Sequence, residues 1–381
     1  MKTVYLDNAA TTQIDEKVLE VMHASMQNNF GNPSSTHQIG RKAKSAVETA
    51  RKNIANHFNV SASEIIFTAG GTEADNLILN NVVLNLGVQR IITSKIEHHA
   101  VLHTCTHLKN TQNIELSYVN VDEFGQPDLL HLEALLSNNT TKTLVSLMLI
   151  NNEIGTLLNT KKIVDLCSAY QALFHSDTVQ AIGHYPIDLQ KTPIDFIVAS
   201  AHKFHGPKGV GFAYFKKGFG VLPMFYGGAQ EMGARSSTEN VHAILGMEKA
   251  LDIAITNLQR DKIYIESIKT YFIELLKNNF KDIAFNGASS NLQTSSYTIL
   301  NVRFPFSNAF LLFKLDLAGI AVSGGSACQS GSNTGSHVLL EILKETDTDK
   351  TSVRFSFSKF TTKLDIEYTI DALKKQIPSL T

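Results

Sequence analysis

The sequence predicts an α/β protein in which helices flank a mainly parallel sheet and a smaller α+β part follows. Short apolar segments alternate with helical patterns from residue 64 to residue 217, which is typical of successive βαβ units. Residues 239–280 contain almost no Gly or Pro and have helical periodicity, so they predict one or two long helices that leave the sheet. Beyond residue 282 a shorter alternation of strand and helix patterns begins.

The individual strands and helices follow from the local pattern. Apolar segments predict strands at 64–68, 90–94, 143–149, 172–176, 196–200 and 211–215. Helices are predicted between them at 72–84, 99–108 and 160–170. The C-terminal part should contain strands at 296–303 and 352–358 and helices at 308–317 and 363–376, the last capped by Thr362 and Asp365. We therefore expect a large domain of residues 13–257 and a small domain made of residues 1–12 and 258–381.

The composition is that of an enzyme-sized protein from a reducing compartment. The 381 residues are 43% hydrophobic and 18% charged, which is enough for a large core and more than one domain. A net charge of -1 disfavours nucleic-acid and anionic-membrane partners. No apolar run reaches the roughly 18 residues that span a bilayer, and residues 1–7 lack the apolar stretch of a signal peptide. The three cysteines show no short-range pairing pattern, so we expect free thiols and a cytoplasmic location.

Lys203 is the most informative residue of the chain. It follows the apolar segment 195–199, lies between two histidines, and is followed by Gly206 and Pro207, which interrupt regular structure. An amine at the end of a buried strand is desolvated, which favours its neutral, nucleophilic form and makes Lys203 a candidate for a Schiff base. The alternative is a surface lysine after an edge strand, the usual environment of lysine. The flanking residues favour the first interpretation.

A candidate phosphate site follows the first predicted strand. Gly70, Gly71 and Thr72 connect this strand to the helix 72–84. Free backbone N–H groups and the Thr72 hydroxyl at a helix N-terminus could hold a phosphate. An ordinary turn in which Thr72 caps the helix is an equally good interpretation, because the segment matches neither a dinucleotide fingerprint nor a Walker loop.

Asp177 follows the strand 172–176, at the edge of the sheet where α/β proteins bind ligands. Its carboxylate could bond a protonated pyridine nitrogen, which pyridoxal phosphate needs to act as an electron sink. The alternative is an aspartate that caps a helix. Lys203 ends the next predicted strand, so both side chains could border one crevice, and this favours the functional interpretation.

Two more polar residues follow predicted strands. His98 comes after the strand 90–94 and could stack on a planar ring and pass protons, although such a histidine is more often a capping or surface residue. Asn152 comes after the strand 143–149. A side-chain amide there could bond a ring hydroxyl, whereas turn chemistry favours Asn in any case.

Cys328 is a candidate nucleophile. It lies in the Ser/Gly-rich stretch 323–336, whose composition predicts a mobile loop with an accessible thiol. Cys105 and Cys167 lie in helical patterns and are expected to be inert. Arg354, on the strand 352–358, could bind a substrate carboxylate through its bidentate guanidinium, or it could be an edge-strand arginine.

Together these residues resemble the cysteine desulfurases, which are pyridoxal-phosphate enzymes of fold type I in the class V aminotransferase group. The resemblance begins at residues 5–12 and 31–35 and continues through the motifs above to Arg354-Phe355-Ser356. The long Cys328 loop is similar to that of group I, which includes the iron–sulfur-cluster and nitrogen-fixation desulfurases. The fold that the resemblance implies has a mainly parallel, seven-stranded sheet flanked by helices and a smaller α+β domain that carries the Cys328 loop.

The resemblance implies a role for each site residue. Lys203 would form the Schiff base with pyridoxal 5′-phosphate, Asp177 would bond the pyridine nitrogen, and His98 would stack on the ring. The residues that would lie near the ring hydroxyl or bind the phosphate are Gln180, Asn152, Gly71, Thr72, Ser200 and His202. Thr238 would reach the phosphate of the neighbouring subunit, which implies a homodimer with shared active sites. Arg354 and Asn152 would hold the substrate carboxylate, and no metal site is implied.

The implied reaction takes sulfur from L-cysteine and leaves L-alanine. Lys203 would remove the α-proton, and the Cys328 thiolate would attack the substrate sulfur and become a persulfide. The implied partner is a sulfur-acceptor protein, either a cluster scaffold or a thiolation relay. The alternatives are a selenocysteine lyase or another pyridoxal-phosphate lyase, and an aminotransferase that would not need Cys328. A non-catalytic paralogue is disfavoured because Lys203, Asp177, His98 and Cys328 are all present.

Four positions depart from the pattern of the family. Met232 stands where Arg is usual, Ser237 and Ser358 stand where Gly is usual, and Gly324 stands where Ser is usual. Ser237 affects the expected placement of Thr238, because Gly permits backbone angles that Ser resists. The longer tail with which housekeeping members help to dock the cluster scaffold is not seen after the last helix, which leaves that partner open.

Overall fold

The central sheet has seven strands in the order β2-β8-β7-β6-β5-β3-β4, as expected. The computed structural model describes residues 2–138, 141–324 and 335–377. All neighbouring strands are parallel except β8, which runs antiparallel to both β2 and β7. The strands are β2 (Ile65–Thr68), β3 (Arg90–Thr93), β4 (Glu115–Tyr118), β5 (Thr143–Ser146), β6 (Leu173–Asp177), β7 (Phe196–Ser200) and β8 (Gly211–Phe215).

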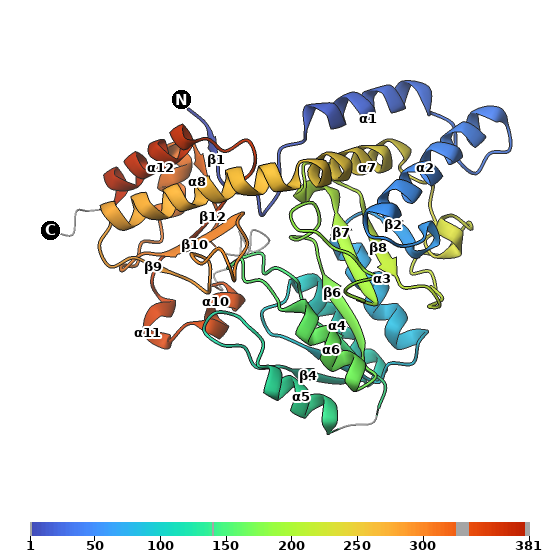
Figure 1. Ribbon diagram of the computed structural model, residues 1–381, viewed down its shortest axis with the longest axis horizontal. Helices are drawn as coiled ribbons and strands as arrows, with labels where there is room; N and C mark the ends of the chain where they lie inside the picture. Colours follow the sequence, from blue (N-terminus) through green and yellow to red (C-terminus); the bar gives the residue numbers. More distant parts are fainter. Residues whose placement is uncertain (1, 139–140, 325–334, 378–381) are drawn as a thin grey trace.

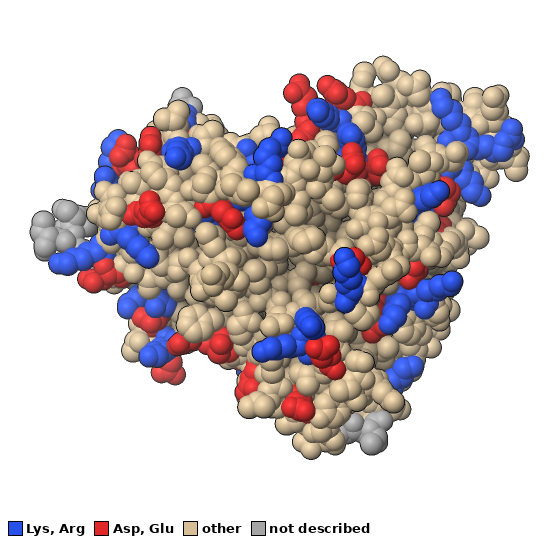
Figure 2. Space-filling view, viewed as in Figure 1, with Lys and Arg blue, Asp and Glu red and all other residues tan. Residues whose placement is uncertain are grey.

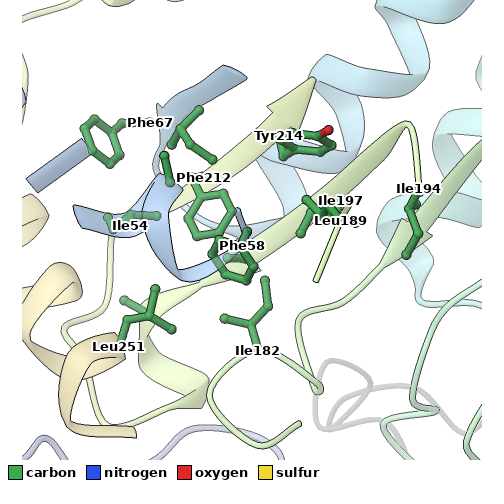
Figure 3. Close-up of a cluster of buried hydrophobic side chains, with 14 of the residues drawn as sticks. Ile54, Phe58, Phe67, Ile182, Leu189, Ile194, Ile197, Phe212, Tyr214 and Leu251 are labelled. Atoms are coloured by element: carbon green, nitrogen blue, oxygen red, sulfur yellow. The ribbon is translucent and has the colours of Figure 1, made fainter. Parts of the chain in front are cut away.

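Helices cover both faces of this sheet, because successive residues of a strand point to opposite faces and both sets are apolar. Phe67, Ile197 and Phe212 belong to the core on one face, where Ile54 and Leu251 pack with them (Figure 3). The helices on this face are α1 (Glu16–Asn28), α2 (Gln38–His57), α5 (Leu129–Ser137), α6 (Thr160–Ala169) and α7 (Val241–Thr256). The other face has a core of its own with α3 (Gly71–Leu84) and α4 (His99–Gln112).

The C-terminal part has a separate core beside the sheet. The helix α8 (Leu258–Asn279) runs from the sheet toward this part, which lies on the left in Figure 1. A three-stranded antiparallel sheet has the order β12-β10-β9, with β12 (Ser352–Ser356), β10 (Ile299–Arg303) and β9 (Ala284–Phe285). The N-terminal strand β1 (Val4–Tyr5) pairs in parallel with β11 (Ile320–Ala321), so the start of the chain packs with its C-terminal part. The remaining helices are α9 (Leu311–Leu317), α10 (His337–Ile342), α11 (Glu345–Thr348) and α12 (Lys363–Gln376).

Several predicted elements have different ends in the structure. The strand predicted at 143–149 ends at Ser146, although the N–H groups of Leu147 and Leu149 still donate to carbonyl groups of β6. The strand predicted at 296–303 begins at Ile299, and the helix predicted at 308–317 begins at Leu311, because a turn occupies its first residues. The last helix has the predicted bounds, and Thr362 and Asp365 form its capping box.

Other elements were not predicted at all. The strand β4 lies at the edge of the sheet and has no fully buried residue, so it lacks the apolar run that marks the other strands. The helices α1, α2, α5, α10 and α11 and the two-residue strands β1, β9 and β11 were also missed. No helix among the described residues is both long enough and apolar enough to cross a membrane. On the face shown in Figure 2, acidic and basic side chains are interspersed.

The topology brings the predicted site residues to one edge of the sheet. The parallel strands β6 and β7 end at Asp177 and Ser200, and α3 begins at Gly71 on the same edge. The carboxyl ends of parallel strands are where α/β proteins bind ligands. Arg354 on β12 reaches this edge from the C-terminal part.

Candidate active site

A cavity of about 680 Å³ lies at this edge, between the sheet and the C-terminal part. Most of the predicted site residues line it together: Gly71, Thr72, His98, Asn152, Asp177, Gln180, Ser200, His202, Lys203 and Arg354. A larger cavity of about 850 Å³ lies elsewhere, lined by residues such as Leu149, Tyr185 and Asn291, and none of the predicted site residues lines it. The chemistry of the side chains, rather than cavity size, therefore identifies the first cavity as the candidate site.

Lys203 lies in a short 3₁₀ turn, Ala201–Lys203, that directly follows β7. Its Nζ donates to the carbonyl oxygens of Ala9 and Ala10 at 2.7 and 2.8 Å. The Gln180 side-chain amide donates to the same Ala9 carbonyl at 2.9 Å. Carbonyl groups of the N-terminal segment thus hold the Lys203 amine beside the C-terminal ends of β6 and β7, where the sequence predicted it.

Asp177 and His98 are the titratable groups next to Lys203. Burial raises the pKa of the Asp177 carboxyl above its ordinary value, while His98 and Lys203 act in the opposite direction. Burial lowers the pKa of His98, so its imidazole is neutral near pH 7. The N–H of Ala100 donates to His98 Nδ1 at 3.1 Å, which places the proton of the neutral ring on Nε2.

The alternative that each residue only caps a helix holds in part for His98 and fails for Asp177. His98 does cap α4, and it lines the cavity as well, so the two interpretations are compatible. Asp177 caps no helix. Its Oδ1 accepts a hydrogen bond from the N–H of Val179 at 2.9 Å in the turn that follows β6.

The start of α3 lines the cavity with Gly70, Gly71 and Thr72. Gly70, with φ 152°, is the N-cap residue, so the interpretation that Thr72 caps the helix is wrong. A Cβ on Gly71 would lie 2.7 Å from Cγ2 of Val179, so only glycine lets the backbone approach this closely. Ser200 and His202 face the cavity beside this helix N-terminus. Burial lowers the pKa of His202 to about 4, with Lys203 and Lys208 adding to the effect.

Arg354 is fully buried although β12 is an outer strand of its sheet. Its guanidinium donates to Asp7 Oδ1 and to the Asn152 carbonyl oxygen, both at 2.9 Å. The Ser323 hydroxyl also donates to Asp7 Oδ1, at 2.9 Å. Arg354 thus lies on an edge strand, and these contacts fix its guanidinium in the wall of the cavity.

One predicted residue of the described structure, Thr238, does not line this cavity. Thr238 lines a separate cavity of about 220 Å³ together with Arg235 and Gly209. Cys328 lies outside the described residues. Cys105 and Cys167 are buried in α4 and α6, and burial raises the pKa of each thiol to about 12, which agrees with an inert character. The described residues contain no cluster of side chains that could hold a metal ion.

Sequence reasoning missed two acidic residues of the site. Asp7 holds Arg354, and its position in the N-terminal segment 5–12 was the available signal. Asp75 lines the cavity from α3, and its place one turn after Thr72 was the available signal, because residues three or four apart share one face of a helix. Neither role can be read from local sequence alone.

Comparison with known proteins identifies the group to which this site belongs. The family model described as aminotransferase class-V matches residues 4–369. The cysteine desulfurase IscS of Dictyoglomus turgidum is 40% identical over 100% of this chain and 95% of its own length. The putative cysteine desulfurase IscS 1 of Bacillus subtilis is 41% identical over 94% of each chain.

Solved structures of NifS-like proteins have the same fold as this chain. A NifS-like protein has a TM-score of 0.90 at 34% identity and covers 98% of this chain and 99% of its own. The NifS-like protein from Rickettsia africae has a TM-score of 0.88 at 34% identity, with the same coverage. The chain belongs to the class-V aminotransferase family. Within this family it groups with the cysteine desulfurases, as the resemblance implied.

The cofactor of these class-V enzymes is pyridoxal 5′-phosphate, and the cavity fits it. The family chemistry needs an amine, an acid for the ring nitrogen and a place for a dianion. Lys203 would supply the amine, Asp177 would supply the acid at the end of the neighbouring strand, and the N-terminus of α3 would supply backbone N–H groups. The clash that a side chain at Gly71 would create shows how closely this backbone is packed.

Proposed function

We propose that the protein converts L-cysteine to L-alanine and holds the released sulfur on Cys328 as a persulfide, for delivery to iron–sulfur-cluster or thiolation acceptors. One observation carries this proposal: a single cavity joins Lys203, Asp177 and Arg354, which come from three distant parts of the chain. Cysteine desulfurases that match the chain over nearly its full length support the choice of substrate.

The cofactor, when bound, supplies an electron sink for the charge left at the substrate Cα. Asp177 holds a proton at the ring nitrogen, and this positive partner offsets the cost of burying the Asp177 carboxylate. Lys203 Nζ takes the α-proton from the substrate, and the Ala9 and Ala10 carbonyl groups orient that amine. His98 Nε2–H is the neighbouring group that can hold or return a proton. Arg354 binds the substrate carboxylate through its fork of N–H donors.

The sulfur transfer step assigns one role to Cys328. Its thiolate attacks the substrate sulfur and forms an S–S bond, while the C–S bond breaks and its electron pair stays with the substrate carbon. That carbon takes up a proton and becomes the methyl group of alanine. The sulfur is then held on Cys328 at the oxidation level from which an acceptor thiolate can remove it.

The protein should act as a homodimer in which Thr238 completes the phosphate site of the neighbouring subunit. The segment before Thr238 exposes four large apolar side chains: Leu222, Phe225, Tyr226 and Met232. Of these, Phe225 also lines the cavity. Exposed apolar groups beside a site are typical of an interface. This arrangement supports a subunit contact next to the cavity, and a cytoplasmic location fits the reduced thiols that the reaction needs.

The division into two domains is proposed at residues 13–257 against 1–12 with 258–381. The separate hydrophobic cores support it, because Leu6 packs with Phe272 and Phe355 in one core while the sheet has its own. The acceptor is proposed to be a protein thiol, and the near-neutral charge disfavours nucleic acid.

The decisive experiment uses the cofactor-loaded protein with L-cysteine and a thiol reductant. Sulfide and alanine should form in equal amounts, and without reductant mass spectrometry should find one added sulfur on Cys328. Cys328→Ser should keep the bound cofactor but release no sulfide. Cys167→Ala should keep both the bound cofactor and the release of sulfide. Sulfide release at the normal rate from Cys328→Ser would remove the assignment, and a strong preference for selenocysteine would favour the lyase alternative.

A further inference from the structure

A buried acid–imidazole pair lies behind Asp177. His175 precedes Asp177 by two residues on β6, so both side chains point to the face of the sheet that α3 and α4 cover. Asp75 reaches the same region from α3, and Ser146 reaches it from β5, where it pairs with His175. Asp75, His175 and Ser146 are each at most 1% exposed.

The three side chains form a short line. His175 Nδ1 lies 2.9 Å from the Ser146 hydroxyl, within hydrogen-bond distance. His175 Nε2 lies 3.4 Å from Oδ1 of Asp75. Neither of these last two atoms has an aligned hydrogen-bond partner elsewhere in the described part of the chain. Two buried acceptors that face each other at this distance need one proton between them, because unpaired buried polar atoms are costly.

The surroundings decide which atom holds that proton. An ionised pair would place two charges in a fully buried region, and a bare Asp75 carboxylate would repel the Asp177 carboxylate. Burial and these two acids raise the pKa of Asp75 well above its ordinary value. Burial lowers the pKa of His175 to about 3. The His175 ring is therefore neutral, and the shared proton is placed on Asp75.

Asp75 and Asp177 are in different environments although they influence each other. Lys203 and His98 act to lower the pKa of Asp177, whereas the influences on Asp75 are burial, Asp177 and Glu97, all of which raise its pKa. When two nearby buried acids compete, the one beside a basic group such as the Lys203 amine ionises first. Asp75 is thus the member of the pair that stays protonated while Asp177 ionises.

We propose that Asp75 is a positioning residue that works as a protonated carboxylic acid. Its O–H donates to His175 Nε2, and the Nδ1–H of the same ring donates to the Ser146 hydroxyl. Asp177 is then the ionised member of the Asp75–Asp177 pair. This inference rests on the proposed function, because it concerns the acid that meets the ring nitrogen. It gives the buried His175 a definite tautomer and explains why an acid can stand so near Asp177 on the wall of the cavity.

The test is an infrared difference spectrum of the cofactor-free protein at pH 7. Wild type minus Asp75→Asn should show the C=O stretch of a protonated carboxylic acid, because that variant removes a neutral acid. Asp195→Asn is the matched control, since Asp195 is also buried but accepts from Lys216 Nζ at 2.9 Å as a carboxylate. Its difference spectrum should show a carboxylate band instead. A carboxylate band for Asp75→Asn would overturn the proposal.

Cofactor binding gives a second readout. Asp75→Asn keeps a neutral donor to His175, so its cofactor affinity should remain within about threefold of wild type. Asp75→Leu removes the donor and should weaken binding more than Asp75→Asn does. If neither variant folds, the ¹⁵N shifts of the His175 ring in the wild-type protein still decide the matter. They should report a neutral ring protonated on Nδ1, and a doubly protonated ring would overturn the proposal.

These readouts are independent of turnover. If the infrared and nitrogen spectra are as expected but no alanine forms from cysteine, the proposed function fails while the protonation of Asp75 stands. If alanine forms but Asp75 is ionised, the inference fails while the proposed function stands.

Discussion

The Arg354 guanidinium donates to Asp7 Oδ1 at 2.9 Å and so joins the last strand of the C-terminal part to the first segment of the chain. Asp7 both orients Arg354 and offsets its charge. Asp7→Ala should raise the KM for cysteine about tenfold with little change in kcat, because a hydrogen bond to a charged group is worth roughly 1.5–3 kcal/mol.

A second variant separates orientation from charge. Asp7→Asn keeps an acceptor for Arg354 but leaves the guanidinium with its full charge, so its KM should stay at or below the wild-type value. Ser323→Ala is the control, since it removes the other donor to Asp7 and leaves Arg354 held. Steady-state kinetics of the four proteins provides the check, and a fall in kcat at constant KM for Asp7→Ala would contradict the positioning role of Asp7.

Stability should fall as the pH drops below about 6.5, the ordinary pKa of histidine. Burial lowers the pKa of His205 to about 4, and the nearby Lys359 contributes. Between these two values the unfolded chain binds a proton at His205 that the folded protein does not bind, so the free energy of unfolding rises with pH across this window. The slope for one such group is about 1.36 kcal/mol per pH unit.

His205→Asn isolates the contribution of this residue. His205 has φ 67°, a backbone conformation that asparagine tolerates better than most residues. Urea unfolding at several pH values between 4.5 and 7.5 should give a shallower dependence for the variant, by about one group's slope. An unchanged pH dependence would show that His205 is protonated in the folded protein.

Ser237 has φ 110°, which confirms that this position adopts a backbone conformation suited to glycine. Ser237→Gly should therefore raise the free energy of unfolding by about 0.5–1 kcal/mol, since relief of backbone strain exceeds the entropy that glycine loses. The reverse change, Gly233→Ser, is the matched control, because Gly233 has φ 86° and no heavy atom lies within 4 Å of the position that a Cβ would take. It should destabilise the protein. Denaturant unfolding measures both, and a destabilised Ser237→Gly would contradict the strain.

The sequence predicted the parts of the site that depend on one strand and its following turn. Lys203 and Asp177 were predicted because each stands at or just after the end of a buried apolar strand, and parallel strands bring such ends together. The partner of Arg354 was not found, because Asp7 is brought to it only by the packing of the N-terminal segment. The line from Asp75 to His175 was missed for the same reason, since it crosses from a helix to a strand.

Gly71 makes a prediction about cofactor binding that can be tested by rescue. A Cβ at this position would lie 2.7 Å from Cγ2 of Val179, whose N–H donates to Asp177. Gly71→Ala must therefore displace Val179 and with it Asp177, the proposed acid for the ring nitrogen. Overpacking of this kind costs about 1–3 kcal/mol. The cofactor-free protein relieves it by letting Val179 move, so the cost falls on the cofactor-bound state as a loss of roughly 5- to 150-fold in affinity.

Alanine is also the better helix former by about 1 kcal/mol, so the melting temperature of the cofactor-free Gly71→Ala protein should change little while its affinity for pyridoxal phosphate falls. Val179→Ala in the same chain removes the methyl group that would clash and should restore most of the affinity. Equilibrium titration with the cofactor measures the wild type, both single variants and the double variant. If the double variant binds as weakly as Gly71→Ala, the loss arises from the helix N-terminus itself and not from displacement of Val179 and Asp177.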